Sequence, residues 1–323
     1  MNERPFPGLG RSVSEIGCGT WGMGGWTGAN DDLSAAALDR AVARGCNFFD
    51  TAAAYGDGHS ERLLGALLSR HRDRFLCVAT KVPSKNRRWP GSASTPASEA
   101  FPADHVVNST RVSLQNLGVN AIDLQQFHVW DDSWTADDGW KRAVEQLKRE
   151  GTIRAFGISV NRWEPENVLL ALATGLVDAV QVVYNVFDQA PEDLLFSECR
   201  KRGIAAIARV PFDEGSLTGT LKHDSRWPEG DWRNRYFTPQ RLAETLPRVE
   251  RLRAIATGWE LTLPELALRF ILSNPTVTTV IPGMRHPRHV DANVGASEAG
   301  SLSSEQIAVL RAHRWDRRPD DCP

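Results

Sequence analysis

The chain has 323 residues, 41% of them hydrophobic, and a formal net charge of −2 at pH 7. This apolar content is enough for a sizeable core, and no break in composition divides the sequence, so we expect one domain over residues 1–323. Acidic and basic residues are interspersed, which argues against nucleic acid or a membrane surface as a partner, because such proteins usually carry a basic excess.

The cysteines and the apolar runs bear on where the protein works. The five cysteines, at positions 18, 46, 77, 199 and 322, are scattered and lack CxxC spacing, which is typical of reduced thiols and not of a zinc site or a disulfide framework. No apolar run approaches the ~20 residues needed to cross a bilayer. The first five residues carry no apolar stretch that could serve as a secretory signal. We therefore expect a cytoplasmic protein.

Short apolar runs of strand type alternate with amphipathic segments along the chain. The expected strands are Glu15–Cys18, Asn47–Asp50, Phe75–Lys81, Ala121–His128, Ile153–Ser159, Ala179–Tyr184, Ile204–Val210 and Thr278–Ile281. The expected helices between them are Leu33–Arg44, Arg62–Ser69, Ala103–Leu117, Gly139–Glu150, Glu164–Ala173 and Asp193–Arg202. Continuously apolar strands separated by helices predict parallel strands buried on both faces. Eight such units predict an α/β fold, a closed (β/α)8 TIM barrel, which suits this length.

Two connections exceed the usual loop length, and two further helices follow the eighth strand. Pro83–Pro102 follows the third strand, and Asp213–Thr238 follows the seventh and is rich in aromatic residues. Loops of this length are usually functional or disordered, and the aromatic content of the second favours an ordered cover over a site. The additional helices are expected at His286–Ala296 and Ser303–Arg314.

Polar residues stand where several predicted strands end. Asp50, Lys81 and His128 end the second, third and fourth strands, and Tyr55 lies on the loop five residues after Asp50. Further polar residues at or near strand ends are Ser159, Gln181 and Arg209, with Gly283 and Arg285 after the eighth strand. In a barrel these ends converge on one rim, the rim that carries catalytic residues in such enzymes.

Each of these residues alone has a structural explanation. Asp50 could cap a turn, Lys81 could be solvated, and His128 could be a hydrogen-bonded core histidine. Together with Tyr55 they also make chemical sense. A neighbouring ammonium lowers the pKa of a phenol, an aspartate keeps that lysine charged, and a histidine orients the substrate oxygen or helps to move the proton. This combination predicts protonation of a carbonyl oxygen while hydride is delivered to its carbon.

The sequence resembles the aldo-keto reductase family over nearly its whole length. The motifs that carry the resemblance are Gly19-Thr20-Trp21-Gly22, Asp50-Thr51-Ala52 with Tyr55-Gly56, Ala79-Thr80-Lys81, Gln126-Phe127-His128, Gly157-Ile158-Ser159, Gln181 with Tyr184-Asn185, Leu217-Thr218-Gly219 and Ile281-Pro282-Gly283. The resemblance implies that Tyr55 is the general acid, that Lys81 lowers its pKa, that Asp50 pairs with Lys81 and that His128 positions the carbonyl. It also implies NADPH as hydride donor, with NAD less favoured.

The same resemblance suggests which residues hold the cofactor. Ser159, Asn161 and Gln181 would hold the nicotinamide carboxamide, although Val160 separates the serine from an asparagine that follows it directly in relatives. Arg209 stands where relatives often stack a tyrosine on the nicotinamide. Near the adenosine end, Arg285 would bind the 2′-phosphate and His289 would assist. The remaining residues assigned to the cofactor are Thr20, Trp21, Asp50, Val210, Pro211, Gly283 and Asn293, together with Gly215, Ser216, Leu217 and Gly219 around the pyrophosphate. Ala292 replaces a glutamate that folds over the cofactor in many relatives, which suggests easier release.

One motif is misleading. Gly17-Cys18-Gly19-Thr20-Trp21-Gly22 fits the dinucleotide-binding pattern G-x-G-x-x-G. That pattern should open a helix at once, but Met23-Gly24-Gly25-Trp26-Thr27-Gly28 follows, which a helix would not tolerate. The match is accidental, and these residues are expected to shape the first loop at the rim.

The expected substrate is a small-molecule carbonyl compound. The expected pocket residues are Trp21, Trp26, Tyr55, His128, Trp130 and Trp232, and indole faces suit sugar rings and other bulky groups, so a keto-sugar is one hypothesis. Two alternatives stay open: a barrel enzyme that uses Lys81 as a Schiff-base nucleophile, and a cofactor-holding regulatory subunit with little turnover. The oligomeric state stays open as well.

Overall fold

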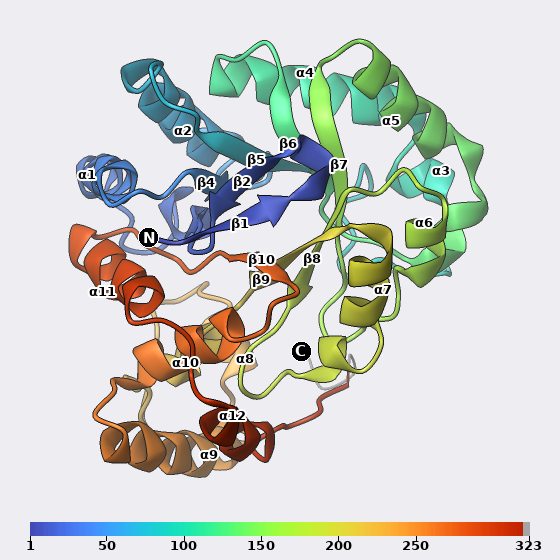
Figure 1. Cartoon of the computed structure of the whole chain (residues 1–323). Helices are drawn as coiled ribbons and strands as arrows, with labels where there is room; N and C mark the ends of the chain where they lie inside the picture. Colours follow the sequence, from blue (N-terminus) through green and yellow to red (C-terminus); the bar gives the residue numbers. More distant parts are fainter. Residues whose placement is uncertain (319–323) are drawn as a thin grey trace.

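The computed structural model describes residues 1–318, and its centre is one parallel sheet of eight strands (Figure 1). In chain order the strands are β3 (Cys18–Gly19), β4 (Phe48–Asp50), β5 (Cys77–Val82), β6 (Ile122–Phe127), β7 (Ile153–Ser159), β8 (Ala179–Val183), β9 (Ala205–Arg209) and β10 (Val277–Val280). Neighbours in the sheet are neighbours in sequence. Parallel bridges Ile16↔Val280 and Gly19↔Gly283 join the first strand region to the last, so the sheet closes. The predicted (β/α)8 barrel is confirmed.

Helices cover the outside of the barrel in alternation with the strands (Figure 1). They are α1 (Asp31–Ala43), α2 (His59–Arg70), α3 (Ala97–Ala100), α4 (Ala103–Leu117), α5 (Asp138–Arg149), α6 (Leu169–Ala173), α7 (Leu195–Arg202), α8 (Arg233–Tyr236), α9 (Pro239–Gly258), α10 (Leu263–Leu272), α11 (Pro287–Glu298) and α12 (Ser304–Arg311). Local signals set several ends. Thr238 caps α9 with Pro239 at its first turn, and Gly118 ends α4 in the left-handed conformation.

Three features depart from the expected elements. The segment predicted as a helix from Glu164 is turns until Leu169, since Pro165 and the side-chain contacts of Asn161 and Glu164 favour a turn there. The chain also begins with an antiparallel hairpin of β1 (Glu3–Phe6) and β2 (Arg11–Ser14), which the alternating pattern did not indicate. Helices α9 and α10 were likewise not expected.

The barrel interior consists of an apolar layer below a polar one. Small and branched side chains pack together inside, with Phe6 of the hairpin stacked on Phe48 from the end where the strands begin. Members of this cluster include Phe48, Ala79, Leu124, Ala155, Ala179 and Ile207. Because side chains alternate across a strand, the residues two positions further on also point inward. These residues are Asp50, Lys81, Gln126, Gly157, Gln181 and Arg209, and they line the mouth where the strands end.

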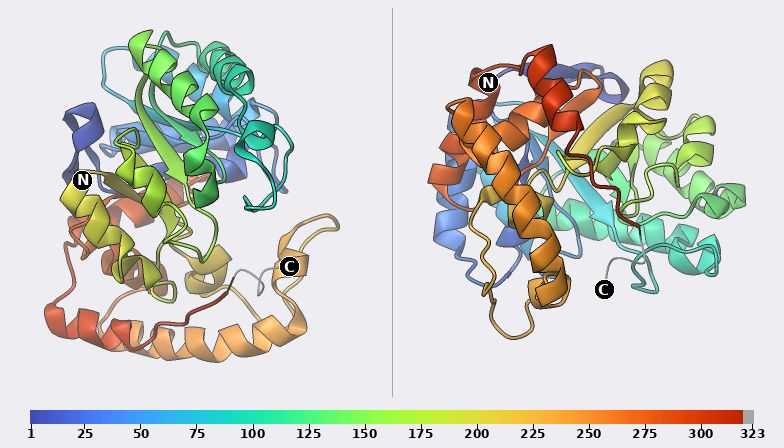
Figure 2. Two further views of the ribbon diagram at one scale, coloured as in Figure 1. Left: turned by 90° about the vertical axis from the view of Figure 1, so that its right-hand side faces the viewer. Right: turned by 90° about the horizontal axis from the view of Figure 1, so that it is seen from below.

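The two long connections are built differently. Pro83–Pro102 contains α3, and its Gly91 is held by Asn161. Asp213–Thr238 contains the turn Asp213–Thr218 and α8. Tyr236 at the end of α8 and the following Phe237 pack in a small apolar cluster with Leu221, Leu242 and Leu246. Figure 2 shows the last described segment passing along α9, in agreement with the position of Arg248 over the ring of Trp315. Arg317 of this segment forms an ion pair with Asp213.

Two sequence expectations concern the whole chain. Within residues 1–318, no helix combines the length and apolar character needed to cross a membrane. Cys18, Cys46, Cys77 and Cys199 are free and buried, and Cys322 lies outside the described residues.

Candidate active site

Lys81 and Asp50 form a buried ion pair at the mouth of the barrel. Nζ of Lys81 lies 2.5 Å from Oδ1 of Asp50 and donates to the carbonyl of Thr51 at 2.8 Å. The other carboxylate oxygen accepts from the amides of Gln181 at 2.7 Å and Gln126 at 3.3 Å. These contacts hold and orient the Lys81 side chain. A Schiff-base nucleophile needs a free amine, whereas Nζ here is held by a carboxylate and a carbonyl, so this environment is unfavourable for that alternative.

Tyr55 reaches the same place from the loop after β4. Its ring lies 5.2 Å from Nζ of Lys81 and edge-on to the ring of His128, with 5.6 Å between the ring centroids. A side chain at Gly24 would collide with the backbone of Tyr55, so glycine allows the loop after β3 to pack closely against this turn. The structure therefore brings Asp50, Tyr55, Lys81 and His128, the tetrad, together at one rim.

Opposite pKa shifts at the two rings follow from their surroundings. Burial raises the pKa of the Tyr55 hydroxyl above its ordinary value, while the charge of Lys81 works in the other direction. Burial, assisted by the positive charges of Lys81 and Arg209, holds the pKa of His128 well below its ordinary value. At neutral pH the phenol therefore carries its proton and the imidazole is neutral. Both groups can then hydrogen-bond to a carbonyl oxygen as donors.

Arg209 adds a second cation to the mouth. Its Nη2 donates to the carbonyl of Val160 at 2.9 Å, and its Nε is buried with no partner among the described residues. Burial and the charge of Arg162 lower its pKa to about 10. Arg162 itself forms an ion pair with Glu214, so the loops after β7 and β9 meet here.

The other residues expected near the nicotinamide lie around the tetrad. Ser159 is buried at the end of β7, and Thr20 hydroxyl donates to the carbonyl of Asp50 at 2.9 Å. The amide of Gln181 donates to Asp50. The amide of Asn161 is paired in both directions with the backbone of Gly91, at 3.1 and 2.9 Å. Asn161 thus holds the Pro83–Pro102 loop. The carboxamide of a nicotinamide would have to compete with Gly91 for the side-chain amide of Asn161.

The loop after β9 has a demanding backbone shape. Val210, Asp213 and Glu214 adopt positive φ values of 56°, 45° and 57°, which is rare for residues with side chains and unusual for a β-branched one. Pro211, Ser216 and Leu217 are buried, and Ser216 Oγ donates to Asp213 at 2.6 Å. Gly215 and Gly219 also have positive φ. The shape of this loop is therefore imposed by contacts around it.

A basic cluster follows β10. Arg285 donates to the carbonyl of Thr27 at 2.9 Å, and Arg288 and His286 contact His289. Burial, assisted by the neighbouring His286, Arg288 and Arg285, lowers the pKa of His289. Asn293, further along α11, is buried, and its Nδ2 has no partner among the described residues. Clustered cations and an unpaired buried donor fit a phosphorylated nucleoside; Gly283 is exposed beside them.

Of the predicted aromatic pocket, one part assembles and one does not. Trp21 lies against Trp26 with the two rings tilted by 37° and 4.3 Å between centroids, and it meets Trp232 edge-on at 6.4 Å. Trp130, in contrast, is fully buried among Phe127, Trp134 and Trp140. Its assignment to the substrate pocket is wrong, because this indole packs in the outer core and does not face the mouth.

Trp89 was missed. Its ring lies edge-on to His128 with 5.2 Å between centroids, and 53% of its surface is exposed. The available signal was its position on the long loop after the third strand, the loop length being a sign of function.

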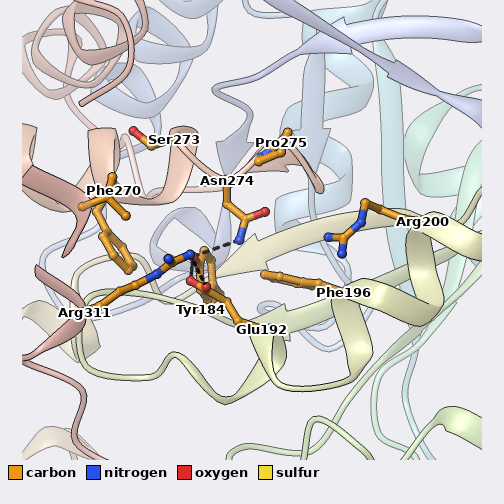
Figure 3. A pocket seen from close by; sticks show the side chains of 10 residues that line it. Tyr184, Glu192, Phe196, Arg200, Phe270, Ser273, Asn274, Pro275 and Arg311 are labelled. Carbon is orange, nitrogen blue, oxygen red and sulfur yellow. Dashed lines mark hydrogen bonds and ion pairs between the residues drawn. The ribbon is translucent and has the colours of Figure 1, made fainter. Parts of the chain in front are cut away.

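A cavity of about 410 Å³ lies elsewhere, outside the barrel between α7, α10 and α12 (Figure 3). Its polar groups bind one another. Tyr184 donates to Glu192 at 2.5 Å, Arg311 donates to Glu192 at 2.8 Å, and Asn274 donates to Tyr184 at 3.3 Å. It contains no tetrad residue and is separate from the candidate site.

A closed barrel with a phenol, an ammonium, a carboxylate and an imidazole at the rim where its strands end is the arrangement of a carbonyl-reducing oxidoreductase. The chain belongs to the aldo/keto reductase family, whose profile matches residues 15–314.

Relatives match over nearly full length. The NADH-specific methylglyoxal reductase of Escherichia coli K12 is 27% identical, over 96% of this chain and 98% of that protein. An NADP(+) aldo-keto reductase of Schizosaccharomyces pombe is 27% identical, over 93% and 88%. The glycerol dehydrogenase of Gluconobacter oxydans superposes with a TM-score of 0.79 at 26% identity, over 96% and 94%.

Proposed function

We propose that this protein is an NADPH-dependent reductase of aldehydes or ketones, able to run in reverse on alcohols. The observation that carries the proposal is the position of Tyr55, between the Lys81–Asp50 ion pair and the ring of His128. Family membership supports the oxidoreductase class. The positions of the tetrad side chains support a proton transfer from Tyr55 to the substrate oxygen.

In this mechanism the substrate carbonyl oxygen accepts hydrogen bonds from the Tyr55 hydroxyl and from neutral His128. Ser159, Gln181 and Arg209 would hold the nicotinamide, which in its reduced form would supply the hydride for the carbonyl carbon. As negative charge develops on the oxygen, Tyr55 transfers its proton to it. Lys81 stabilises the phenolate that remains, and the ion pair with Asp50 keeps Lys81 in place.

The dinucleotide would extend from the mouth, where Ser159, Gln181 and Arg209 lie, past the Asp213–Thr218 turn to the basic cluster after β10. Relatives are described with either NADH or NADP(+). The choice of NADPH for this chain therefore rests on its own side chains, the cation Arg285 first and the imidazole of His289 second, which suit a 2′-phosphate. The buried free thiols also fit a reducing compartment, and we propose that the protein is cytoplasmic.

The exposed indoles suggest a substrate with a large flat or ring-shaped surface. Trp21 and Trp89 are 43% and 53% exposed, and Trp89 lies against His128. Such faces pack on sugar rings as well as on aromatic rings, which supports a keto-sugar or another bulky carbonyl as substrate.

The direct test is to titrate the protein with NADPH and NADH by fluorescence, and then to follow NADPH oxidation with a carbonyl panel that includes keto-sugars. Turnover with preference for NADPH supports the proposal. Turnover of simple aromatic aldehydes alone would contradict the keto-sugar assignment. Tight NADPH binding without turnover of any carbonyl would indicate a cofactor-holding subunit instead.

A further inference from the structure

Arg317, in the segment after α12, is buried between two carboxylates. Only 4% of its side chain is exposed. One terminal nitrogen lies 2.5 Å from Oδ2 of Asp188 and the other lies 2.7 Å from Oδ1 of Asp213. Its guanidinium also lies 5.0 Å from the ring centroid of Trp163 and 4.8 Å from that of Trp315. A planar two-pronged cation is suited to bridging two carboxylates in this way.

Asp213 connects this arginine to the strained loop after β9. It begins the turn Asp213–Thr218, and its Oδ2 accepts from the hydroxyl of Ser216. Its own φ of 45° and that of Glu214, 57°, are left-handed conformations without glycine. Such a shape persists only where neighbouring contacts enforce it. Here Arg317 supplies one contact and Ser216 another.

Asp188 connects the same arginine to the turn after β8. It accepts from the amide of Asn185 at 2.8 Å, and that amide also donates to the carbonyl of Val210 at 3.1 Å. Arg317 therefore ties together the two rim loops that follow the consecutive strands β8 and β9. Removal of one partner of a buried pair is strongly destabilising, because it leaves a buried charge without compensation.

A neighbouring arginine provides the contrast. Arg314 lies three residues earlier and forms ion pairs with Asp193 and Asp316, with a side-chain exposure of 33%. Asp193 lies further along the connection after β8 than Asp188, and within residues 1–318 neither ion-pair partner of Arg314 belongs to the Asp213–Thr218 turn. Exposed pairs of this kind contribute little to stability.

We propose that Arg317 is a positioning residue for the dinucleotide: through Asp213 it fixes the Asp213–Thr218 turn in the shape that receives the pyrophosphate. The inference rests on the proposed function, which places the pyrophosphate at this turn. The C-terminal segment is then part of the cofactor site, although it does not touch the reacting atoms.

The experiment compares Arg317→Leu with its matched control, Arg314→Leu, in the full chain. NADPH affinity is measured by fluorescence titration, and affinity for adenosine 2′-monophosphate is measured by calorimetry. The second ligand probes the basic cluster after β10 but has no pyrophosphate. We expect Arg317→Leu to weaken NADPH about tenfold, within the range of coupling through packed networks. It should change adenosine 2′-monophosphate binding less than about twofold, and Arg314→Leu should leave both ligands unchanged.

A double-mutant cycle tests the route through Asp213. If Arg317 acts through this carboxylate, Asp213→Asn combined with Arg317→Leu should bind NADPH no more weakly than Asp213→Asn alone. Additive losses would contradict that route. If Arg317→Leu does not fold, Arg317→Lys carries the test, since lysine keeps the charge but cannot bridge both carboxylates with a planar fork.

Three results would overturn the proposal. The first is wild-type NADPH affinity in Arg317→Leu, or in Arg317→Lys if the leucine variant does not fold. The second is a loss of NADPH affinity in Arg314→Leu equal to that in the Arg317 variant. The third is a loss of adenosine 2′-monophosphate affinity in the Arg317 variant that parallels its loss of NADPH affinity. Failure of the proposed function looks different, because the wild-type protein itself would then not bind NADPH, and both proposals would fall together.

Discussion

Tyr55 and His128 meet edge to face at the barrel mouth, with 5.6 Å between ring centroids, and their pKa values are displaced in opposite directions. Burial favours the neutral form of each group, which is the protonated phenol and the unprotonated imidazole. The pair is therefore ready to donate to a carbonyl oxygen at neutral pH. Lys81, which lies 5.2 Å from the Tyr55 ring, stabilises the phenolate only once the proton has left.

Removal of the Tyr55 hydroxyl should abolish proton transfer without disturbing the cofactor site. We expect Tyr55→Phe to bind NADPH as the wild type does and to lose at least ~100-fold in turnover, the lower range for acid–base catalysis. Steady-state kinetics and fluorescence titration check the two parts. Tyr184→Phe is the matched control, because its hydroxyl is buried against Glu192 outside the site. A comparable loss of turnover in the control would remove the special role of Tyr55.

The pH dependence should differ between the two directions of the reaction. Carbonyl reduction requires the protonated phenol, whose pKa is raised, so reduction should stay constant through neutral pH and fall only above the ordinary tyrosine value of ~10. Alcohol oxidation requires the phenolate and should increase as pH rises. Lys81→Met removes the charge that lowers this pKa, so at pH ~9 oxidation should fall more than reduction. Equal losses in both directions would indicate a role for Lys81 other than tuning Tyr55.

Arg285 should discriminate between the two dinucleotides. Arg285→Ala should weaken NADPH much more than NADH, because only NADPH carries the 2′-phosphate. Titration of both cofactors measures the difference. Arg40→Ala provides the control, since Arg40 also contacts α11, but through Asp291. Equal losses for NADPH and NADH would move the phosphate contact to another residue.

Arg209 should favour the reduced cofactor. A hydride donor close to Tyr55 must also lie near this cation, and the oxidised nicotinamide is positively charged whereas the reduced ring is neutral. Two unit charges ~8 Å apart at an effective dielectric constant of ~20 interact by about 2 kcal/mol. Arg209→Gln should therefore improve binding of NADP+ relative to NADPH on the order of tenfold. Separate titrations with NADP+ and NADPH measure the ratio of the two affinities. An unchanged ratio would show that the charge of Arg209 does not act on the nicotinamide.

The sequence by itself determined the barrel and the tetrad. Strand β7 over Ile153–Ser159 and helix α4 over Ala103–Leu117 have the predicted bounds, because both are encoded in local apolar patterns. Asp50 and Lys81 could be placed at the mouth of the barrel from the sequence. Alternation along a strand determines which residues face inward, and the strand ends determine their position along the barrel axis.

Only the tertiary structure decided which loop residues meet. Trp130 and Trp89 both follow barrel strands on connecting segments, yet the first is buried in the outer core and the second lies on His128. Loops have no periodicity that fixes the direction of a side chain. The same holds for Arg317, whose partners Asp188 and Asp213 lie more than a hundred residues away. The choice of a charged partner depends on which segments folding brings together and on how fully they exclude water, and neither is encoded locally.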